Sequence, residues 1–418
     1  MNKKLKTLIT LLFMGTAYSI IYALPFVQYV FYDPMVEGLK ATNAQLGVLI
    51  TIFGIGNLLA PIGGWFSDRF NHKKIFIGGL IATSLLNFLF AFNLNYKFAL
   101  FIWFGLAISG LLVYFPAHIK IVRLLGDENN QGKIFGLSES AAGIGSVVIN
   151  TIALFLFSRA ISDIVGLKFA VIGYGLAGIL AAIVLWFLIE VPDDIQSIKE
   201  EEKIKASDFL TVLKYPGTWF AGIAIFTTYT LYVSLSYFTP YFTSVLGVSV
   251  AFSGGLAIVR TYLIRFVGSP LGGMMGDKIS SVSKVLAISF ASALLIILGF
   301  LNLPVGANMT LIIALTLLIS VFTYVSRGNM FAVPAEVKSP AKYAAMTAGI
   351  TCAIGYSPDL FQFILFGHWL DKYGNQGYKY IFIYTMVILL LGIVSSVLTL
   401  NFKKKIDGKE FSGQSQLQ

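Results

Sequence analysis

Two arginines in this 418-residue chain lie inside a long apolar stretch. A charged group is costly in such a stretch, so its presence there indicates a function. Arg265 lies twelve residues before Asp277 and Arg260 lies seventeen before it. On a helix, these separations correspond to about 18 Å and about 25 Å. A guanidinium group stays charged and presents a planar set of donors, which suits a carboxylate, phosphate or nitrate. We therefore predict that Arg265 binds an anion; the alternative is a structural pairing with an internal carboxylate or with helix carbonyl groups.

Helical phase separates the two arginines. At about 100° per residue, one face of the predicted helix is polar. This face carries Thr261, Tyr262, Arg265 and Ser269. Arg260 falls on the apolar face, so it fits a substrate role and a structural role equally well. We expect Tyr262 to act beside Arg265.

Tyrosines recur at helical spacing in two other apolar stretches. Tyr18 and Tyr22 are four residues apart, and Tyr229 and Tyr232 are three apart. Phenol groups donate hydrogen bonds to substrate oxygens, and their rings shape a pocket. We predict that these four residues line the binding site, with simple helix packing as the alternative.

The stretches that carry these residues have the composition of membrane helices. Apolar residues make up 57% of the chain and charged residues 12%, and the mean hydropathy is +0.80. A helix needs about 20 apolar residues to cross the hydrocarbon layer, and in lipid it satisfies its own backbone hydrogen bonds. Twelve stretches qualify: 7–32, 43–67, 75–93, 97–122, 134–158, 168–190, 214–244, 250–276, 285–302, 308–332, 342–368 and 378–401. The predicted fold is an all-α membrane protein.

A long polar segment divides the twelve spans into six and six. We predict an N-terminal bundle at 1–190, a cytoplasmic linker at 191–213, a C-terminal bundle at 214–402 and a cytoplasmic tail at 403–418, which is polar and disordered beyond Lys405. With the N-terminus inside, 22 Lys and Arg residues fall in cytoplasmic segments and six outside. The net charge of +10 is therefore explained by topology without nucleic acid. Both termini are predicted to be cytoplasmic.

A motif repeats at half the chain length. PIGGWFSDR begins at Pro61 and PLGGMMGDK begins at Pro270, at the ends of the second and eighth predicted spans respectively. Twelve spans in two halves, with Gly-x-x-x-Asp-[Arg/Lys] at both of these places, resemble the major facilitator superfamily. The resemblance covers essentially the whole chain and is closest to the branches that carry anions, organophosphates and nitrate. It implies two pseudo-symmetric six-helix bundles that transport a solute by alternating access.

The resemblance also implies a set of gating residues on the cytoplasmic side. They are Gly64, Asp68, Arg69, Gly273, Asp277, Lys278 and Arg123. A carboxylate at a helix end is stabilised by the positive N-terminus of another helix, and Asp68 is expected to act as such a latch. The alternative is that the glycines only permit close packing. Asn71 and His72, and later Ser280 and Ser281, replace the glycine and basic residue usual in the motif, which weakens the gating assignment most in the second half.

Other classes of function find little support. The lone cysteine, Cys352, and three scattered histidines give no metal cluster, and no ATP-binding loop is present. We therefore expect no cofactor, no enzymatic activity and a monomer in a bacterial cell membrane. The favoured function is secondary transport of a small anion, by symport with protons or by exchange for a counter-anion. Glu139 and Asp359 are the candidate coupling carboxylates. The alternative is a proton-coupled exporter of drugs or other apolar compounds.

Overall fold

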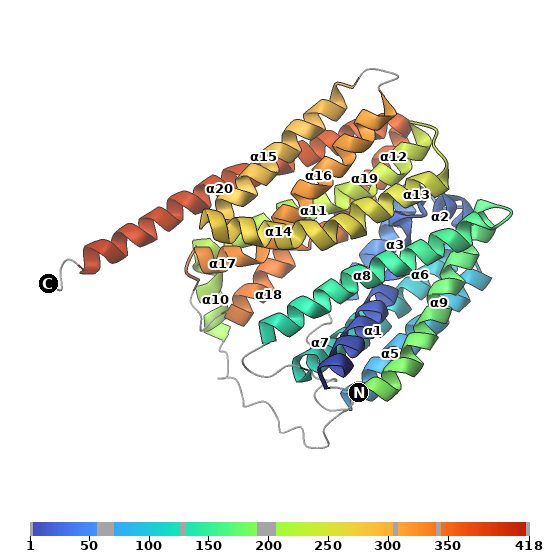
Figure 1. The fold of residues 1–418 in the computed structure, drawn as a ribbon. Coiled ribbons are helices and arrows are strands. Elements are labelled where there is room, and N and C mark those ends of the chain that lie inside the picture. The colour runs from blue at the N-terminus through green and yellow to red at the C-terminus, as the bar shows by residue number, and fades with distance from the viewer. Residues whose placement is uncertain are drawn as a thin grey trace. The chain divides into compact units, whose positions relative to one another are not determined.

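The computed structural model is helical, and the residues it describes contain no strand (Figure 1). It describes residues 3–56, 71–125, 131–189, 206–303, 308–339 and 344–414. These residues form two packing units. Unit 1 comprises residues 1–198, 236–263 and 359–375, and unit 2 comprises 199–235, 264–358 and 376–418. This grouping follows packing, and the predicted bundle boundaries stay a prediction.

Unit 1 consists of helices from the first half of the chain and two short segments from the second. Its elements are α1 (Lys3–Ala23), η1 (Val27–Tyr29), α2 (Tyr32–Leu39), α3 (Asn43–Ile55), α5 (His72–Phe92), α6 (Tyr96–Leu106), η3 (Ala107–Tyr114), α7 (Phe115–Leu124), α8 (Gln131–Ser158), α9 (Asp163–Leu188), α12 (Phe238–Ser244), α13 (Val250–Ile258), η4 (Val259–Leu263) and most of α19 (Pro358–Tyr373). Helix α1 lies against α8, and α5 lies against α9 (Figure 1). A side chain at Gly15 would overlap the backbone of Ala141, so glycine lets α1 approach α8.

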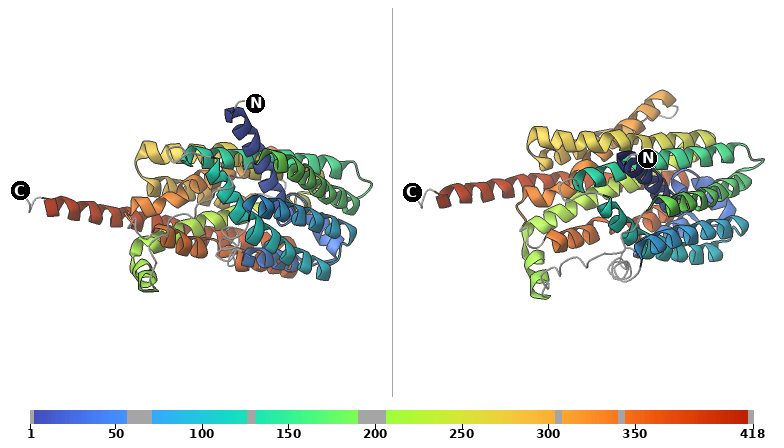
Figure 2. Two further views of the ribbon diagram at one scale, coloured as in Figure 1. Left: turned by 90° about the horizontal axis from the view of Figure 1, so that it is seen from below. Right: turned by 60° about the horizontal axis from the view of Figure 1, so that its bottom comes forward.

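Unit 2 contains the remaining helices of the second half. They are α10 (Ala206–Lys214), most of α11 (Pro216–Ser236), α14 (Ile264–Ile279), α15 (Val282–Leu301), α16 (Met309–Asn329), η5 (Met330–Ala332), α17 (Val333–Glu336), α18 (Ala344–Gly355) and α20 (Gly377–Gln414). The short η7 (Gly374–Gln376) precedes α20. Helix α15 packs between α16 and α20, and α14 packs on α16 (Figure 1). Figure 2 shows α20 as a single long helix at the red end of the colour scale.

The described helices agree with the predicted spans. Ten stretches are long and apolar enough to cross a membrane, or eleven if the bent pair α2 and α3 is one span. The last stretch, Met346–Asp407, covers both spans predicted at 342–368 and 378–401. The span predicted at 43–67 is described only as far as Gly56. The all-α membrane fold is therefore confirmed, and the described part of the chain is consistent with about twelve spans.

Two boundaries differ from the prediction. The first span does not continue to residue 32, because α1 ends at Ala23 and the chain turns through Pro25 into η1. Proline lacks the backbone N–H that would continue the helix. At the other end, the segment predicted to be disordered beyond Lys405 is helical as far as Gln414. A polar segment need not be disordered, because it can continue a helix that precedes it.

Two π-helical segments interrupt the spans. They are η3 (Ala107–Tyr114) and η4 (Val259–Leu263). In a π-helix the hydrogen bonds run from i to i+5, and such segments often mark functional sites. The regular 100° phase therefore fails across η4. Arg260, expected on an apolar face, lies within η4 and is fully buried with 0% exposure.

Candidate functional site

The first copy of the repeated motif lies outside the described residues. Gly64, Asp68 and Arg69 fall in the segment 57–70, so their predicted gating role stays a prediction. Arg123, the other predicted gating residue of the first half, is described and is exposed in the last turn of α7.

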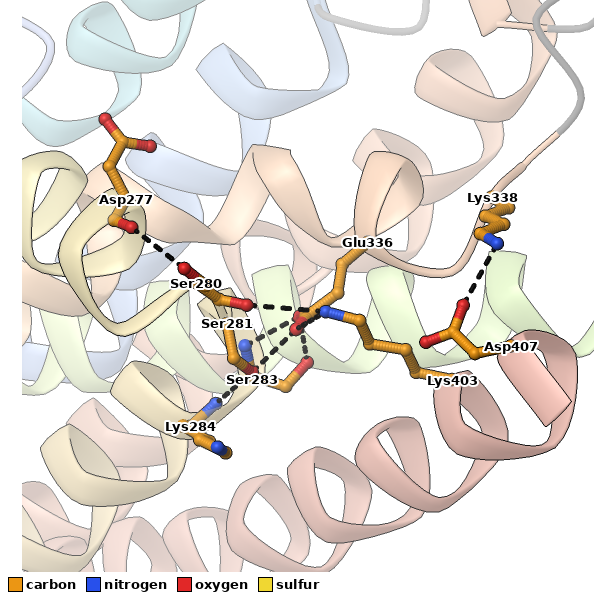
Figure 3. A network of polar contacts seen from close by, with 9 residues as sticks. All are labelled: Asp277, Ser280, Ser281, Ser283, Lys284, Glu336, Lys338, Lys403 and Asp407. Atoms are coloured by element: carbon orange, nitrogen blue, oxygen red, sulfur yellow. Dashed lines mark hydrogen bonds and ion pairs between the residues drawn. The ribbon is translucent and has the colours of Figure 1, made fainter. Parts of the chain in front are cut away.

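The second copy lies at the end of α14 on the surface of unit 2. Asp277 and Lys278 are exposed. The backbone carbonyl of Asp277 accepts a hydrogen bond from Ser280 N at 3.1 Å, and its carboxylate points away from the neighbouring polar network (Figure 3). A side chain at Gly273 would meet nothing within 4 Å, whereas its neighbour Gly272 faces Val325 on α16. Of the adjacent pair, it is therefore Gly272 that permits close packing.

A different acid, Glu336, occupies the buried position beside the second motif. Its side chain is 4% exposed and faces the start of α15 (Figure 3). Its carboxylate accepts hydrogen bonds from Ser283 N at 2.7 Å, Ser283 Oγ at 2.6 Å and Ser281 Oγ at 2.7 Å. Lys403 Nζ on α20 lies 3.4 Å from the same carboxylate. A carboxylate at a helix N-terminus is favourable, so Glu336 joins α17 to α15 and α20.

The two residues that follow Glu336 also make polar contacts with other helices or with the residues beside them. Lys338 Nζ lies 3.0 Å from Asp407 on the exposed surface (Figure 3). The Tyr215 hydroxyl, from the residue before α11, donates to the Val337 carbonyl. Burial raises the pKa of this phenol. The end of α17 therefore contacts both α20 and the start of α11.

Arg260 belongs to a buried hydrogen-bonded chain in unit 1. Its Nη2 donates to Thr239 Oγ1 at 2.7 Å, and the Phe238 ring lies 6.0 Å from its Cζ. Thr239 Oγ1 in turn donates to the Tyr29 carbonyl at 2.7 Å. These contacts connect η4 with α12 and η1. Such contacts are typical of an arginine that stabilises the packing of neighbouring segments. A substrate role for Arg260 stays a prediction.

The predicted tyrosines of α1 form an aromatic cluster within unit 1. The Tyr18 ring lies 4.7 Å from that of Tyr22 and 5.4 Å from that of His118 on α7. Tyr22 also makes an edge contact with Phe53 on α3 at 5.9 Å. Tyr18 and Tyr22 are each partly exposed. The structure therefore groups them with His118, which the tyrosine spacing alone did not indicate.

The predicted tyrosines of α11 form a second cluster within unit 2. Tyr229 lies 5.7 Å from Tyr232 and 4.6 Å from Tyr356. Tyr232 contacts Tyr324 on α16 at 6.2 Å. The guanidinium carbon of Arg327 lies 4.5 Å from the centre of the Tyr232 ring. This cluster therefore contains one cation and four phenol groups.

The other predicted binding and coupling residues differ in their exposure. Arg265 and Tyr262 are partly exposed on either side of the junction between η4 and α14. Glu139 is exposed on α8. Asp359 is 5% exposed at the start of α19, where its backbone carbonyl accepts from Thr51 Oγ1 at 3.0 Å. Among the described residues there is no group of three potential ligands that could hold a metal ion.

Comparison with known proteins decides the family. A model described as Major Facilitator Superfamily matches residues 7–357. The chain belongs to the Major Facilitator Superfamily.

Relatives within the superfamily are bacterial. The chain is 32% identical over 403 residues to the inner membrane protein YqcE of Escherichia coli K12, covering 93% of this chain and 94% of the relative. It is 25% identical over 299 residues to the probable galactarate/D-glucarate transporter GarP of the same strain, covering 63% and 64%. A bacterial homologue of the human lysosomal transporter Spinster has the same fold, with a TM-score of 0.72, 18% identity and coverage of 97% and 98%.

Membership of the superfamily confirms the coarse functional prediction. The protein is a multi-pass membrane transporter with a small-molecule substrate, and it is not an enzyme. The charge of the substrate, the coupled ion and the orientation of the termini are separate questions.

Three residues of the α11 cluster were missed in the sequence: Arg327, Tyr324 and Tyr356. Arg327 was counted among the cytoplasmic loop cations, but it lies in α16, nine residues before the end of the candidate span Met309–Glu336. Nine residues correspond to about 14 Å of helix. Its position three residues after Tyr324 places both on one helix face, and this spacing is the signal that could have found them.

Proposed function

We propose that this superfamily member is a secondary transporter that moves a small anionic solute across the cell membrane by alternating access. The observation that carries the proposal is Arg327. It lies within a candidate membrane span and makes no ion pair with a carboxylate in the described part of the chain. A cation at this depth favours an anionic partner.

The other arginines within candidate spans also favour a negatively charged substrate. Arg260 and Arg265 lie in the candidate span Val250–Ile279. GarP, whose name gives galactarate and glucarate as its solutes, is a distant relative, and both compounds are anions. We assign Arg327 and Arg265 to the substrate, with Tyr18, Tyr22, Tyr229, Tyr232 and Tyr262 as further lining residues.

The transport cycle follows from the two-half organisation of the chain. Alternating access in transporters built from repeats is rocking of one half against the other around a fixed site. The cytoplasmic side would be held by Gly64, Asp68 and Arg69 in the first half and by the Glu336 contacts in the second. The movement of the solute is coupled to protons or to exchange for another anion, so that the gradient of the coupled ion supplies the energy.

Ligand-induced thermal stabilisation of the purified protein tests the proposal. A ligand that binds only the folded state stabilises it by RT ln(1 + [L]/Kd), about 2.7 kcal/mol at 100 times Kd. Carboxylates, phosphate, nitrate and lipophilic cations would be screened at the same ionic strength. We expect at least one anion to raise the unfolding temperature and the cations to have no effect. Stabilisation by lipophilic cations alone would contradict the anion assignment and favour an exporter of apolar compounds.

A further inference from the structure

The Arg327 cluster lies within a single packing unit, and its members come from three parts of the chain. Tyr229 and Tyr232 lie on α11, Tyr324 and Arg327 on α16, and Tyr356 directly after α18. All four phenols are electrostatic neighbours of the guanidinium group. Tyr229 is 5% exposed and Tyr324 is fully buried, whereas Tyr232, Tyr356 and Arg327 are partly exposed. The cluster therefore has buried residues, Tyr229 and Tyr324, and partly accessible residues that include Arg327.

The guanidinium group is held in one orientation and has an unused donor. The Tyr232 ring covers it, with 4.5 Å between the Arg327 Cζ atom and the ring centre. Its Nη1 atom is buried and has no hydrogen-bond partner among the described residues. A buried donor without a partner destabilises the protein, and more so when the group is charged. An oxyanion that approached in the plane of the guanidinium group would remove this cost.

The surrounding helices explain how such an arrangement is maintained. Gly268 on α14 faces Tyr324, because a side chain at Gly268 would lie 2.8 Å from the Tyr324 Cβ atom. Asn329, two residues after Arg327, donates to the Gly272 carbonyl at 2.7 Å. Helix α16 is therefore fixed on both sides of Arg327, which pre-organises the donor before a ligand arrives.

Charge and polarity narrow the class of ligand. One guanidinium group balances one negative charge, so a singly charged group leaves no uncompensated charge in the cluster. A planar carboxylate matches the fork of donors. Phenol rings pack on the C–H groups of a carbon chain, while their hydroxyl groups exchange hydrogen bonds with alcohol groups.

We propose that Arg327 and its four tyrosines bind a small hydroxylated monocarboxylate, with the carboxylate on Arg327 and the hydroxyl groups against the phenols. This inference rests on the proposed transport of an anion and names the residue and the substrate class. Tyr232 positions the guanidinium group, and Tyr229, Tyr324 and Tyr356 face the carbon chain.

A matched series of six-carbon compounds tests the proposal. Gluconate has one carboxylate, glucarate has two and sorbitol has none, and all three are polyhydroxylated. Thermal stabilisation of the purified full chain would be measured with each, alongside benzoate and inorganic phosphate. We expect gluconate to bind most tightly, glucarate more weakly and sorbitol not at all. Stronger stabilisation by benzoate or phosphate than by gluconate would overturn the substrate class.

Two variants test the residue. Arg327→Gln removes the charge, and Arg327→Lys keeps the charge but loses the planar fork. We expect the gluconate Kd to rise about 10- to 100-fold in Arg327→Gln, as loss of a charge-assisted hydrogen bond implies. Arg327→Lys should fold and also bind at least 10-fold more weakly, so the test does not depend on the folding of the neutral variant. Lys284→Gln, at an exposed residue of α15, is the control and should bind as wild type.

The outcomes separate this inference from the proposed function. If anions stabilise wild type and both Arg327 variants equally, the assignment of Arg327 is wrong and anion transport still stands. If no anion stabilises the wild type but lipophilic cations do, the proposed function and the inference both fail. Equal binding of gluconate and sorbitol would show that the phenols bind the polyol without help from the guanidinium group.

Discussion

A buried threonine shows how a single hydroxyl group can hold an arginine inside a membrane protein. Thr239 Oγ1 accepts from Arg260 and donates to the Tyr29 carbonyl, each at 2.7 Å. Arg260 is 0% exposed and Thr239 is 1% exposed. Because water cannot replace the lost partner, the hydroxyl group should be worth more here than at a surface.

Thr239→Val, which keeps the shape of the side chain, should therefore lower the free energy of unfolding by about 1–3 kcal/mol. The measurement is the shift in thermal unfolding of the purified protein. Thr316→Val is the matched control, since Thr316 is also buried and, among the described residues, its hydroxyl group bonds only to the Ile312 carbonyl of its own helix. Equal shifts in the two variants would show that the link to Arg260 adds nothing.

The identity of the individual site residues was only partly predictable. Tyr229 and Tyr232 were identified because three-residue spacing on a helix is visible in one sequence. Arg327 was missed because charge counting cannot tell a cation near a helix end from one in the following loop. The π-helical segment that contains Arg260 was not predicted, because it is a local change in hydrogen bonding that hydrophobic periodicity does not reveal.

Helix contacts in unit 2 depend on one glycine of an adjacent pair. A side chain at Gly272 would overlap the Val325 carbonyl oxygen and lie 2.8 Å from the Val325 Cα atom. At Gly273 it would meet nothing within 4 Å. The two positions are neighbours on α14, so they differ in packing and little else.

Gly272→Ala should therefore destabilise the protein by about 1–3 kcal/mol through separation of α14 from α16. Gly273→Ala should be neutral or stabilise by about 0.5–1 kcal/mol, because alanine has the better helix propensity. Thermal unfolding of both variants under identical conditions gives the comparison. If Gly273→Ala were the more harmful change, the predicted gating role of Gly273 would gain support that packing cannot explain.

A second contrast concerns the acid beside the repeated motif. Glu336 joins α17 to α15 and α20, whereas Asp277 is exposed. We expect Glu336→Gln to lower the free energy of unfolding by about 1–3 kcal/mol, because hydrogen bonds to a charged group are lost or weakened. Asp277→Asn should lie within about 0.5 kcal/mol of wild type. A larger effect at Asp277 would indicate that its carboxylate is engaged in another state of the transporter.

The helices themselves were more predictable than their contacts. Long apolar stretches reveal spans because a helix in lipid must satisfy its own backbone. The break after Ala23 follows from Pro25, which could have been anticipated. By contrast, the sequence did not show that the buried acid at the start of α15 is Glu336 and not Asp277. This depends on which helix ends pack together, and a single sequence does not contain that information.

The orientation of the whole molecule in the membrane is set by its basic residues. Cytoplasmic segments are predicted to hold 22 Lys and Arg residues and outer segments six. Lys97 at the start of α6 is then outside, and Lys284 in the first turn of α15 is inside. Both side chains belong to exposed residues, so a cysteine at either position is accessible to reagents on its own side of the membrane.

Labelling of single cysteines in intact cells checks this orientation. In a Cys352→Ser background, Lys97→Cys should react with a membrane-impermeant maleimide in intact cells, and Lys284→Cys should react only after permeabilisation. The background variant without an added cysteine is the control for other thiols. The reverse pattern would place Glu336, which contacts the start of α15, on the outer side. The contacts proposed to hold the cytoplasmic side closed would then belong to the outer gate, while the Arg327 site within its unit would be unaffected.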